Sequence, residues 1–191
     1  MNIPNILTGL RIVLIPVLVV AYYLPGPWGH RIATGVFVLA ALTDWLDGYL
    51  ARRLNQHSPL GAFLDPVADK LVVATALVLL ASDPTLWGEV LDGRVFAVTV
   101  AIIIGREITV SALREWMAEL GHRAAVAVSV LGKIKTIGQM LAITLLLYRE
   151  PLAGLPVFRW GEWLLYAAAV LTLWSMFLYL RSAWPRLVGD A

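Results

Sequence analysis

Long apolar stretches separated by short polar breaks run along this chain. A helix needs about twenty apolar residues to cross the hydrocarbon core of a bilayer, and six stretches are close to that length. They cover residues 6–24, 31–53, 63–81, 94–116, 123–147 and 162–180. The breaks contain Pro, Gly, Asn, Asp and Ser and are short, so consecutive helices are expected to be antiparallel neighbours. The pattern predicts an all-α integral membrane protein with a six-transmembrane-helix bundle.

The composition excludes several other classes of protein. Of the 191 residues, 60% are apolar and 15% are charged, whereas soluble domains are about half apolar and about a quarter charged. The absence of cysteine excludes a disulfide framework, a zinc–thiolate site and a cysteine nucleophile. The formal net charge is +2 without a dense Lys/Arg run, which argues against nucleic acid as a partner. We expect a single membrane domain over residues 1–191.

Arginines near the predicted span ends indicate an orientation, because positive residues gather on the cytosolic side of membrane helices. If both termini are inside, the inner side carries Arg52, Arg53, Arg114, Arg123, Arg181 and Arg186. The outer side then carries Arg31, Arg94, Arg149 and Arg159. This bias predicts that both termini are cytosolic. The first apolar stretch has no charged segment before it and continues to membrane length, so we expect a span there and no cleavable signal peptide.

Four aspartates interrupt the second and third apolar stretches. Asp44 and Asp47 lie near the end of the second stretch, and Asp65 and Asp69 lie near the start of the third. At about 100° per residue, each pair falls on one face of its helix. The two helices are joined by a short turn on the inner side, so the two faces are expected to meet near the inner membrane surface. A charged side chain inside a membrane segment is costly and indicates a functional site.

Four facing carboxylates repel one another unless positive charge lies between them. Hard divalent cations with oxygen ligands meet this need, and Mg²⁺ or Mn²⁺ fit best. Two such ions also bind a diphosphate and stabilise a displacement at phosphorus. Gly48, Ala51 and Gly61 lie on the same faces and leave room for a ligand near the backbone. The alternative is ion pairing within the bundle, with the nearest candidate cations Arg52, Arg53 and Lys70.

The spacing of these residues resembles the signature of the CDP-alcohol phosphatidyltransferase family. The matching positions are Asp44, Asp47, Gly48, Ala51, Arg52, Gly61, Asp65 and Asp69. The resemblance implies a six-helix membrane enzyme that transfers a phosphatidyl or similar group from a CDP-linked donor to an alcohol and releases CMP. It also implies that the four aspartates bind two divalent cations, with Asp69 acting as general base as well. Gly48, Ala51, Arg52 and Gly61 would then lie against the CDP portion of the donor.

A second group of polar residues lies in the fourth and fifth apolar stretches. Its members are Arg106, Glu107, Ser111, Arg114, Lys133 and Lys135. Lys135 falls on a small, polar helical face, whereas Lys133 points about 160° away from it, so Lys135 is the better candidate for an inward role. Inward cations near the inner surface indicate an anionic acceptor, most simply one that bears a phosphate. The alternative is that Arg106, Arg114 and Lys133 bind lipid headgroups or pair with nearby glutamates.

Further motifs resemble the branch of the family whose acceptor is sn-glycerol 3-phosphate. They are Asn2-x2-Asn5-x2-Thr8-x2-Arg11, Gly105-Arg106-Glu107, Ser111-x2-Arg114-Glu115-Trp116 and Gly132-Lys133-x-Lys135-Thr136. The resemblance implies CDP-diacylglycerol as donor, phosphatidylglycerol phosphate as product, and an acceptor phosphate held by Arg106, Arg114 and Lys135. Asn5 and Thr8 would line the donor site. It also implies a homodimer in contact with membrane lipids in the bacterial inner membrane.

Two other functions stay open on the sequence. One is the same chemistry with another acceptor, such as inositol phosphate, serine or phosphatidylglycerol. The other is a divalent-cation transporter in which the four aspartates form the permeation site. A transporter is less favoured, because the chain shows no internal repeat and because the cations near the aspartates would repel a permeating ion.

Overall fold

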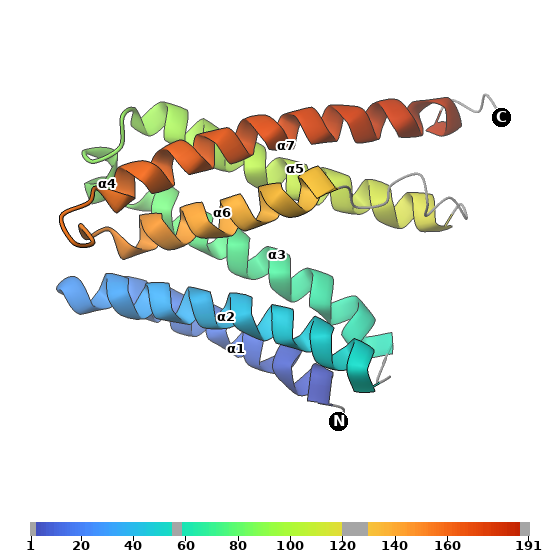
Figure 1. The fold of residues 1–191 in the computed structure, drawn as a ribbon, viewed down its shortest axis with the longest axis horizontal. Coiled ribbons are helices and arrows are strands. Elements are labelled where there is room, and N and C mark those ends of the chain that lie inside the picture. The colour runs from blue at the N-terminus through green and yellow to red at the C-terminus, as the bar shows by residue number, and fades with distance from the viewer. Residues whose placement is uncertain (1–2, 55–58, 120–129, 188–191) are drawn as a thin grey trace.

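The computed structural model describes residues 3–54, 59–119 and 130–187, and these ranges are almost entirely helical (Figure 1). The helices are α1 (Ile3–Tyr22), α2 (Pro27–Leu54), α3 (Pro59–Ser82), α4 (Pro84–Trp87), α5 (Gly93–Glu119), α6 (Val130–Tyr148) and α7 (Val157–Leu187). Within the described ranges, extended pairing is limited to an isolated bridge between Leu152 and Leu155. Each long helix overlaps one predicted apolar stretch, so the all-α prediction is confirmed.

Local turn chemistry explains where the helices end. After α1, Gly26 adopts a φ of +82°, which glycine tolerates without a steric penalty, and Pro27 then begins α2. Asp83 caps α4 by accepting a hydrogen bond from the Thr85 backbone N–H at 2.9 Å, with Pro84 in the first turn. The helices end at three of the polar breaks between the apolar stretches, at residues 25–27, 82–84 and 151–156. The breaks predicted at residues 55–59 and 119–122 lie mostly outside the described residues.

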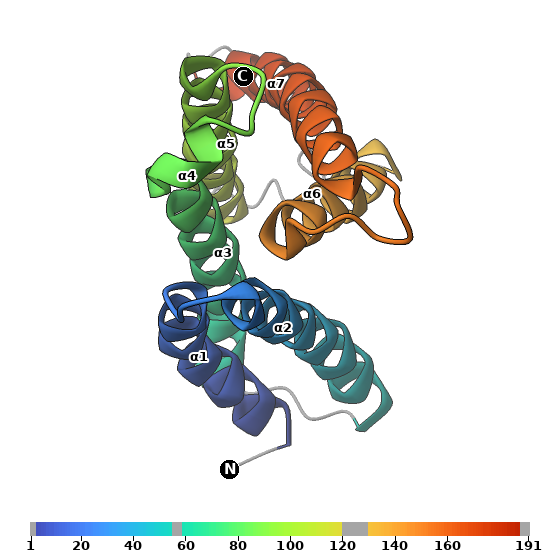
Figure 2. The same cartoon turned by 90° about the vertical axis from the view of Figure 1, so that its left-hand side faces the viewer.

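The helices form two groups, which both contact α3 and which also meet where α2 packs against α6. Helix α1 packs along α2, and α6 packs along α7, which also contacts α5. Helix α3 contacts α1, α2, α5 and α6, and Figures 1 and 2 show it between the two groups. The N-terminal ends of α1, α3 and α6 and the C-terminal ends of α2 and α5 lie at the same end of the molecule, on the right in Figure 1.

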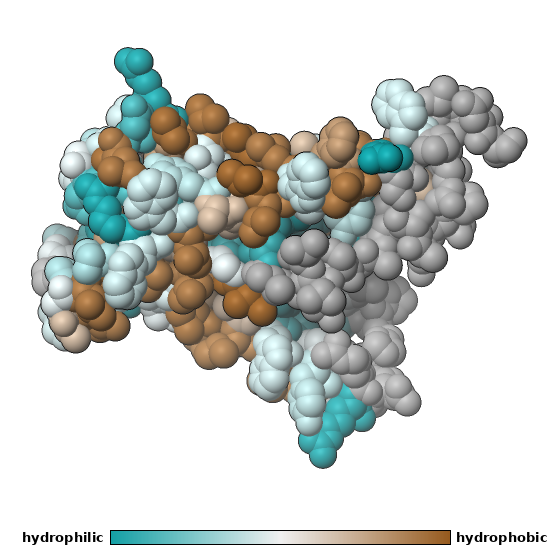
Figure 3. All heavy atoms as spheres, turned by 45° about the horizontal axis from the view of Figure 1, so that its top comes forward, coloured by the Kyte–Doolittle hydropathy of each residue, from teal (hydrophilic) through white to brown (hydrophobic). Residues whose placement is uncertain are grey.

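Apolar side chains fill the centre of the bundle and also cover much of its outside. Buried members of the core are Leu18, Phe37, Leu77, Leu80, Phe96, Ile103, Ile143 and Leu146. Large apolar side chains are also exposed on the outer faces, including Val13, Leu42, Val98, Val170 and Trp174. The face in Figure 3 is mostly hydrophobic across its middle, with hydrophilic side chains toward its left-hand end. Such an exterior suits a hydrocarbon environment, where exposed apolar surface carries no cost.

In the described part of the chain, three helices are long and apolar enough to cross a membrane. Their apolar segments are Asn5–Tyr22 in α1, Gly93–Met117 in α5 and Val157–Arg181 in α7. Helix α6 contains a shorter apolar segment, Lys135–Tyr148. Helices α2 and α3 carry the aspartates and do not meet the same requirement within the part of the chain described. The structure thus supports a helical membrane protein with three candidate spans.

A polar cluster ties several helices together at the end of the molecule that carries α4. Arg149, which follows α6 with a left-handed φ of +66°, donates to Asp83 at 2.8 Å, to Glu89 at 2.9 Å and to the Thr85 hydroxyl at 2.8 Å. Tyr22, the last residue of α1, donates to the same Asp83 oxygen at 2.9 Å. We call these five residues the α4-end cluster. It links α1, α4 and α6, and its arginine is largely buried.

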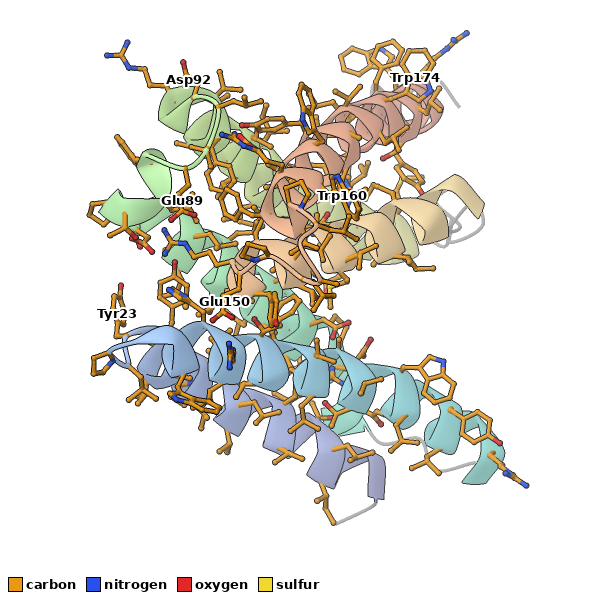
Figure 4. All side chains as sticks on the ribbon, turned by 60° about the vertical axis from the view of Figure 1, so that its left-hand side comes forward. Tyr23, Glu89, Asp92, Glu150, Trp160 and Trp174 are labelled. Atoms are coloured by element: carbon orange, nitrogen blue, oxygen red, sulfur yellow. The ribbon has the colours of Figure 1, made fainter. Side chains whose placement is uncertain are left out.

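We expect Arg149→Met to lower the free energy of unfolding by about 3 kcal/mol, because it removes one partner of a largely buried ion pair. Unfolding of the detergent-solubilised protein, followed by circular dichroism, measures the effect. Arg31→Met is the matched control, since Arg31 pairs with Glu150 at 2.6 Å on the exposed surface near the same end (Figure 4). Equal shifts in the two variants would contradict the assigned role of Arg149.

The pKa values of two groups in this region depart from their ordinary values. Burial lowers the pKa of His30 below 6.5, and the positive charge of Arg149 lowers it further, against the opposing effects of Asp83, Glu89 and Glu150. Burial alone would raise the pKa of Asp83, but hydrogen bonds from Thr85 and Tyr22 and the charge of Arg149 outweigh it and keep that pKa below 3.8. Folded His30 therefore binds a proton less readily than an unfolded histidine does, because its pKa is lowered.

Stability is therefore expected to fall as the pH decreases below about 6.5, because the unfolded state binds a proton that folded His30 does not. His30→Gln removes this difference in proton binding. Unfolding midpoints measured between about pH 7 and 5 should decline less steeply in this variant than in the wild type. Parallel pH profiles would show that His30 does not contribute.

Candidate active site

The four signature aspartates lie on two helices that face α1. Asp44 and Asp47 are in the last third of α2, and Asp65 and Asp69 are in the first half of α3. Asp47 is buried, with its side chain 4% exposed, whereas the side chains of Asp44 and Asp69 are 46% and 47% exposed. Asp47 is therefore an inner, buried member of the cluster, whereas a substrate can reach the carboxylates of Asp44 and Asp69.

Thr8 connects the two pairs of aspartates. Its buried hydroxyl lies 3.0 Å from Asp47 Oδ2 on α2 and 2.5 Å from Asp65 Oδ1 on α3. A hydroxyl has a single hydrogen and donates to one carboxylate at a time. Thr8 alone therefore cannot compensate both charges, and further positive charge is required nearby.

Arg11 supplies part of that charge. It lies one helical turn after Thr8 on α1, and its side chain is 1% exposed. Its Nη1 is 3.1 Å from Asp69 Oδ1, and its Nη2 is 3.2 Å from Asp44 Oδ1 and 3.6 Å from Asp47 Oδ2. One guanidinium thus contacts three of the four aspartates.

The carboxylates have the donor chemistry of a site for hard divalent cations. All the ligand atoms are oxygens, and Asp47 Oδ1 is buried with no hydrogen-bond partner among the described residues. As arranged here, however, no group of three or more acidic or histidine side chains in the described ranges is placed to hold a metal ion. Thr8 and Arg11 contact the same oxygens that a cation would use. The residues present fit such an ion in chemistry and charge.

A second polar cluster is centred on Glu107 of α5. Glu107 Oε1 lies 2.5 Å from Arg106 Nη1 and 3.7 Å from Lys135 Nζ on α6. The side chains of Arg106 and Lys135 are 9% and 2% exposed. Arg106 Nε and Lys135 Nζ lack a hydrogen-bond partner in the described part of the chain. Two buried cations that share one carboxylate retain the capacity to bind an anion.

The two clusters adjoin through α3 and α5. Lys70, the residue after Asp69, donates a hydrogen bond to the Ser111 hydroxyl. Ser111 lies one turn after Glu107 on α5, so the contact brings the aspartate cluster next to the cation cluster. Of the cations in the alternative ion pairing, Arg53 donates to Tyr49 and Lys70 donates to Ser111, and the side chain of Arg52 lies outside the described residues. Among the described residues, the cation paired with the aspartates is Arg11.

Other predicted site residues have different surroundings. Arg114 is exposed, two turns after Arg106 on α5. Gly61 is buried at the start of α3, and Gly48 and Asn5 are half-buried on α2 and α1. The side chains of Ala51, Arg52 and Lys133 lie outside the described residues.

Comparison with known proteins identifies the family of this chain. A model of the CDP-alcohol phosphatidyltransferase family matches residues 1–174. The chain belongs to the CDP-alcohol phosphatidyltransferase family. The four aspartates, whose spacing resembles the family signature, lie where α1, α2 and α3 meet.

Similar proteins carry a more specific name. A Pseudomonas fluorescens protein called CDP-diacylglycerol--glycerol-3-phosphate 3-phosphatidyltransferase is 53% identical over 192 residues, which cover 100% of this chain and 94% of the relative. A protein of that name from Salmonella choleraesuis (strain SC-B67) is 50% identical, covering 95% of this chain and 94% of the relative. Another from Yersinia pestis (strain Pestoides F) is 51% identical and covers 98% of both chains.

Arg11 belongs to one of the sequence motifs above, but the motif assigned it no role. The available signal was an arginine inside an apolar stretch, which is rare and indicates function or pairing. The motif spacing could not reveal that Arg11 faces the aspartates, because this depends on how α1 packs against α2 and α3. Glu107 was likewise grouped with these cations on the sequence, but its position between Arg106 and Lys135 was not predicted.

Proposed function

We propose that this protein transfers the phosphatidyl group of CDP-diacylglycerol to sn-glycerol 3-phosphate, giving phosphatidylglycerol phosphate and CMP. The observation that carries the proposal is the name shared by relatives that are 50–53% identical over nearly the whole chain. Two adjoining clusters, one of carboxylates and one of buried cations, support it. They suit a reaction that brings together a nucleotide diphosphate and a phosphate-bearing alcohol.

In this proposal Asp44, Asp47, Asp65 and Asp69 bind two divalent cations, Mg²⁺ or Mn²⁺. When bound, the ions offset the negative charge of the diphosphate and stabilise the charge that develops during displacement. Asp47 Oδ1, which is buried and has no hydrogen-bond partner among the described residues, supports a cation there. Gly48, Ala51, Arg52 and Gly61 are proposed to contact the CDP portion of the donor. Asn5 and Thr8 would line the same site from α1.

The proposed acceptor site lies at the cation cluster. Arg106 and Lys135 would hold the phosphate of sn-glycerol 3-phosphate, and the more exposed Arg114 would extend the positive surface. The contact between Lys70 and Ser111 supports a short path from this phosphate site to Asp69. Asp69 would accept the proton of the acceptor hydroxyl. The hydroxyl oxygen forms a bond to the phosphorus that carries diacylglycerol, and the bond from that phosphorus to the CMP oxygen breaks.

We further propose that the six long helices all cross the bacterial inner membrane as one domain, with both termini in the cytosol. Helices α2 and α3 have the length of spans, at 28 and 24 residues, and their carboxylates lower their hydropathy. The aspartates would then lie near the cytosolic face, within reach of a nucleotide and a water-soluble acceptor. A homodimer surrounded by membrane lipids is part of this proposal.

We expect purified protein with Mg²⁺ and CDP-diacylglycerol to release CMP when sn-glycerol 3-phosphate is supplied. Inositol phosphate, inositol, serine and phosphatidylglycerol serve as separate test acceptors and should give no release above background. Asp69→Asn should slow release by about 10²–10⁴-fold, because the general base is lost. CMP release with a different acceptor would keep the chemistry but overturn the acceptor assignment.

Lys135→Met should raise the KM for sn-glycerol 3-phosphate by roughly tenfold to a hundredfold, because a charged hydrogen bond to phosphate contributes about 1.5–3 kcal/mol. The KM for CDP-diacylglycerol should change much less. Arg94→Met, an exposed cation at the opposite end of α5, is the control and should leave both constants unchanged. A Lys135→Met variant that affected both substrates equally would contradict a specific role at the acceptor phosphate.

A further inference from the structure

Arg11 has an unusual environment for an arginine in an apolar helix. Its side chain is almost completely buried, and it reaches Asp69, Asp44 and Asp47 at 3.1, 3.2 and 3.6 Å. Arg11 Nε has no hydrogen-bond partner among the described residues. The guanidinium is therefore held in place chiefly by its ion pairs with the aspartates.

The same carboxylates cannot serve Arg11 and divalent ions independently. A guanidinium and a metal ion that both contact them repel each other, and the repulsion is strong because a buried pair is poorly screened by salt. One positive charge also does not neutralise four carboxylates, so an attraction for further cations persists. Arg11 must lower that attraction without abolishing it.

We propose that Arg11 is a resident counter-cation of the aspartate cluster, which shares the carboxylates of Asp44, Asp47 and Asp69 with divalent ions and weakens the binding of those ions. This inference rests on the proposed function, because it takes the aspartates to be metal ligands. Arg11 acts through the aspartates and is thus a positioning residue. It keeps the carboxylates together while ions exchange, and it prevents the ions and the phosphates bound to them from being held too tightly.

Binding of Mn²⁺ to the detergent-purified, full-length protein tests the proposal. The signal of free Mn²⁺ in electron paramagnetic resonance gives the dissociation constant without any turnover. We expect Arg11→Met to bind Mn²⁺ at least about tenfold more tightly than the wild type, because a positive charge next to the ions is gone. Arg11→Lys, which keeps the charge, should stay within about threefold of the wild type. Arg31→Met, which removes an exposed arginine far from the aspartates, should match the wild type.

Thermal unfolding provides a second readout. Without divalent ions, Arg11→Met should unfold at a lower temperature than the wild type, because the buried carboxylate of Asp47 loses a charged partner. Added Mn²⁺ should raise its unfolding temperature by more than it raises that of the wild type, since tighter binding stabilises the folded state more. Arg11→Gln, which is neutral but can still donate hydrogen bonds, carries the same expectations if Arg11→Met does not fold.

The outcomes separate this inference from the proposed function. If wild-type protein binds Mn²⁺ and Asp44→Asn weakens that binding, but the neutral Arg11 variants bind it equally or less tightly, the counter-cation role is overturned and the metal site stands. If the wild type shows no saturable Mn²⁺ binding, both the metal site and the role of Arg11 are overturned. Tighter binding in the neutral variants together with unchanged binding in Arg11→Lys supports the inference.

Discussion

The packing of the first three helices depends on how the negative charges of the aspartates are paired among apolar side chains. Asp47 is buried on α2, and Thr8 and Arg11 of α1 contact it together with Asp65 and Asp69 of α3. Buried carboxylates are costly unless hydrogen-bonded or paired. Helix α1 must therefore pack against both α2 and α3, and it does so. The first three helices form one unit around this charge.

The two ends of the bundle use polar residues differently. At the α4 end, Arg149 pairs closely with Asp83 and Glu89, and helix ends are held together. At the other end, Arg11 contacts three carboxylates, and Lys135 and Arg106 share a single glutamate. Among the described residues, charge of each sign is therefore incompletely paired at this end, where the proposed reaction would bind its charged substrates.

The two clusters at that end have opposite charge, and α3 contacts helices that carry members of each cluster. Helices α1 and α2 surround the carboxylates, and α5 and α6 carry the buried cations. In the proposed reaction the donor would bind at the carboxylate cluster and the acceptor at the cation cluster. Asp69, which Lys70 follows directly, lies where the two clusters adjoin. The order of the helices in space thus matters as much as the residues themselves.

The sequence by itself determined the helical membrane class, the approximate extent of the long helices and the family, because apolar length and the fixed aspartate spacing are local properties. Helical periodicity also put each pair of aspartates on one face. Only the tertiary structure decided that Arg11 is the cation beside the aspartates and that Glu107 bridges Arg106 and Lys135. It also decided that Arg149 of the loop after α6 pairs with residues sixty or more positions earlier. These contacts join helices far apart in the chain, and helical periodicity gives the direction of a side chain but not the neighbour it meets.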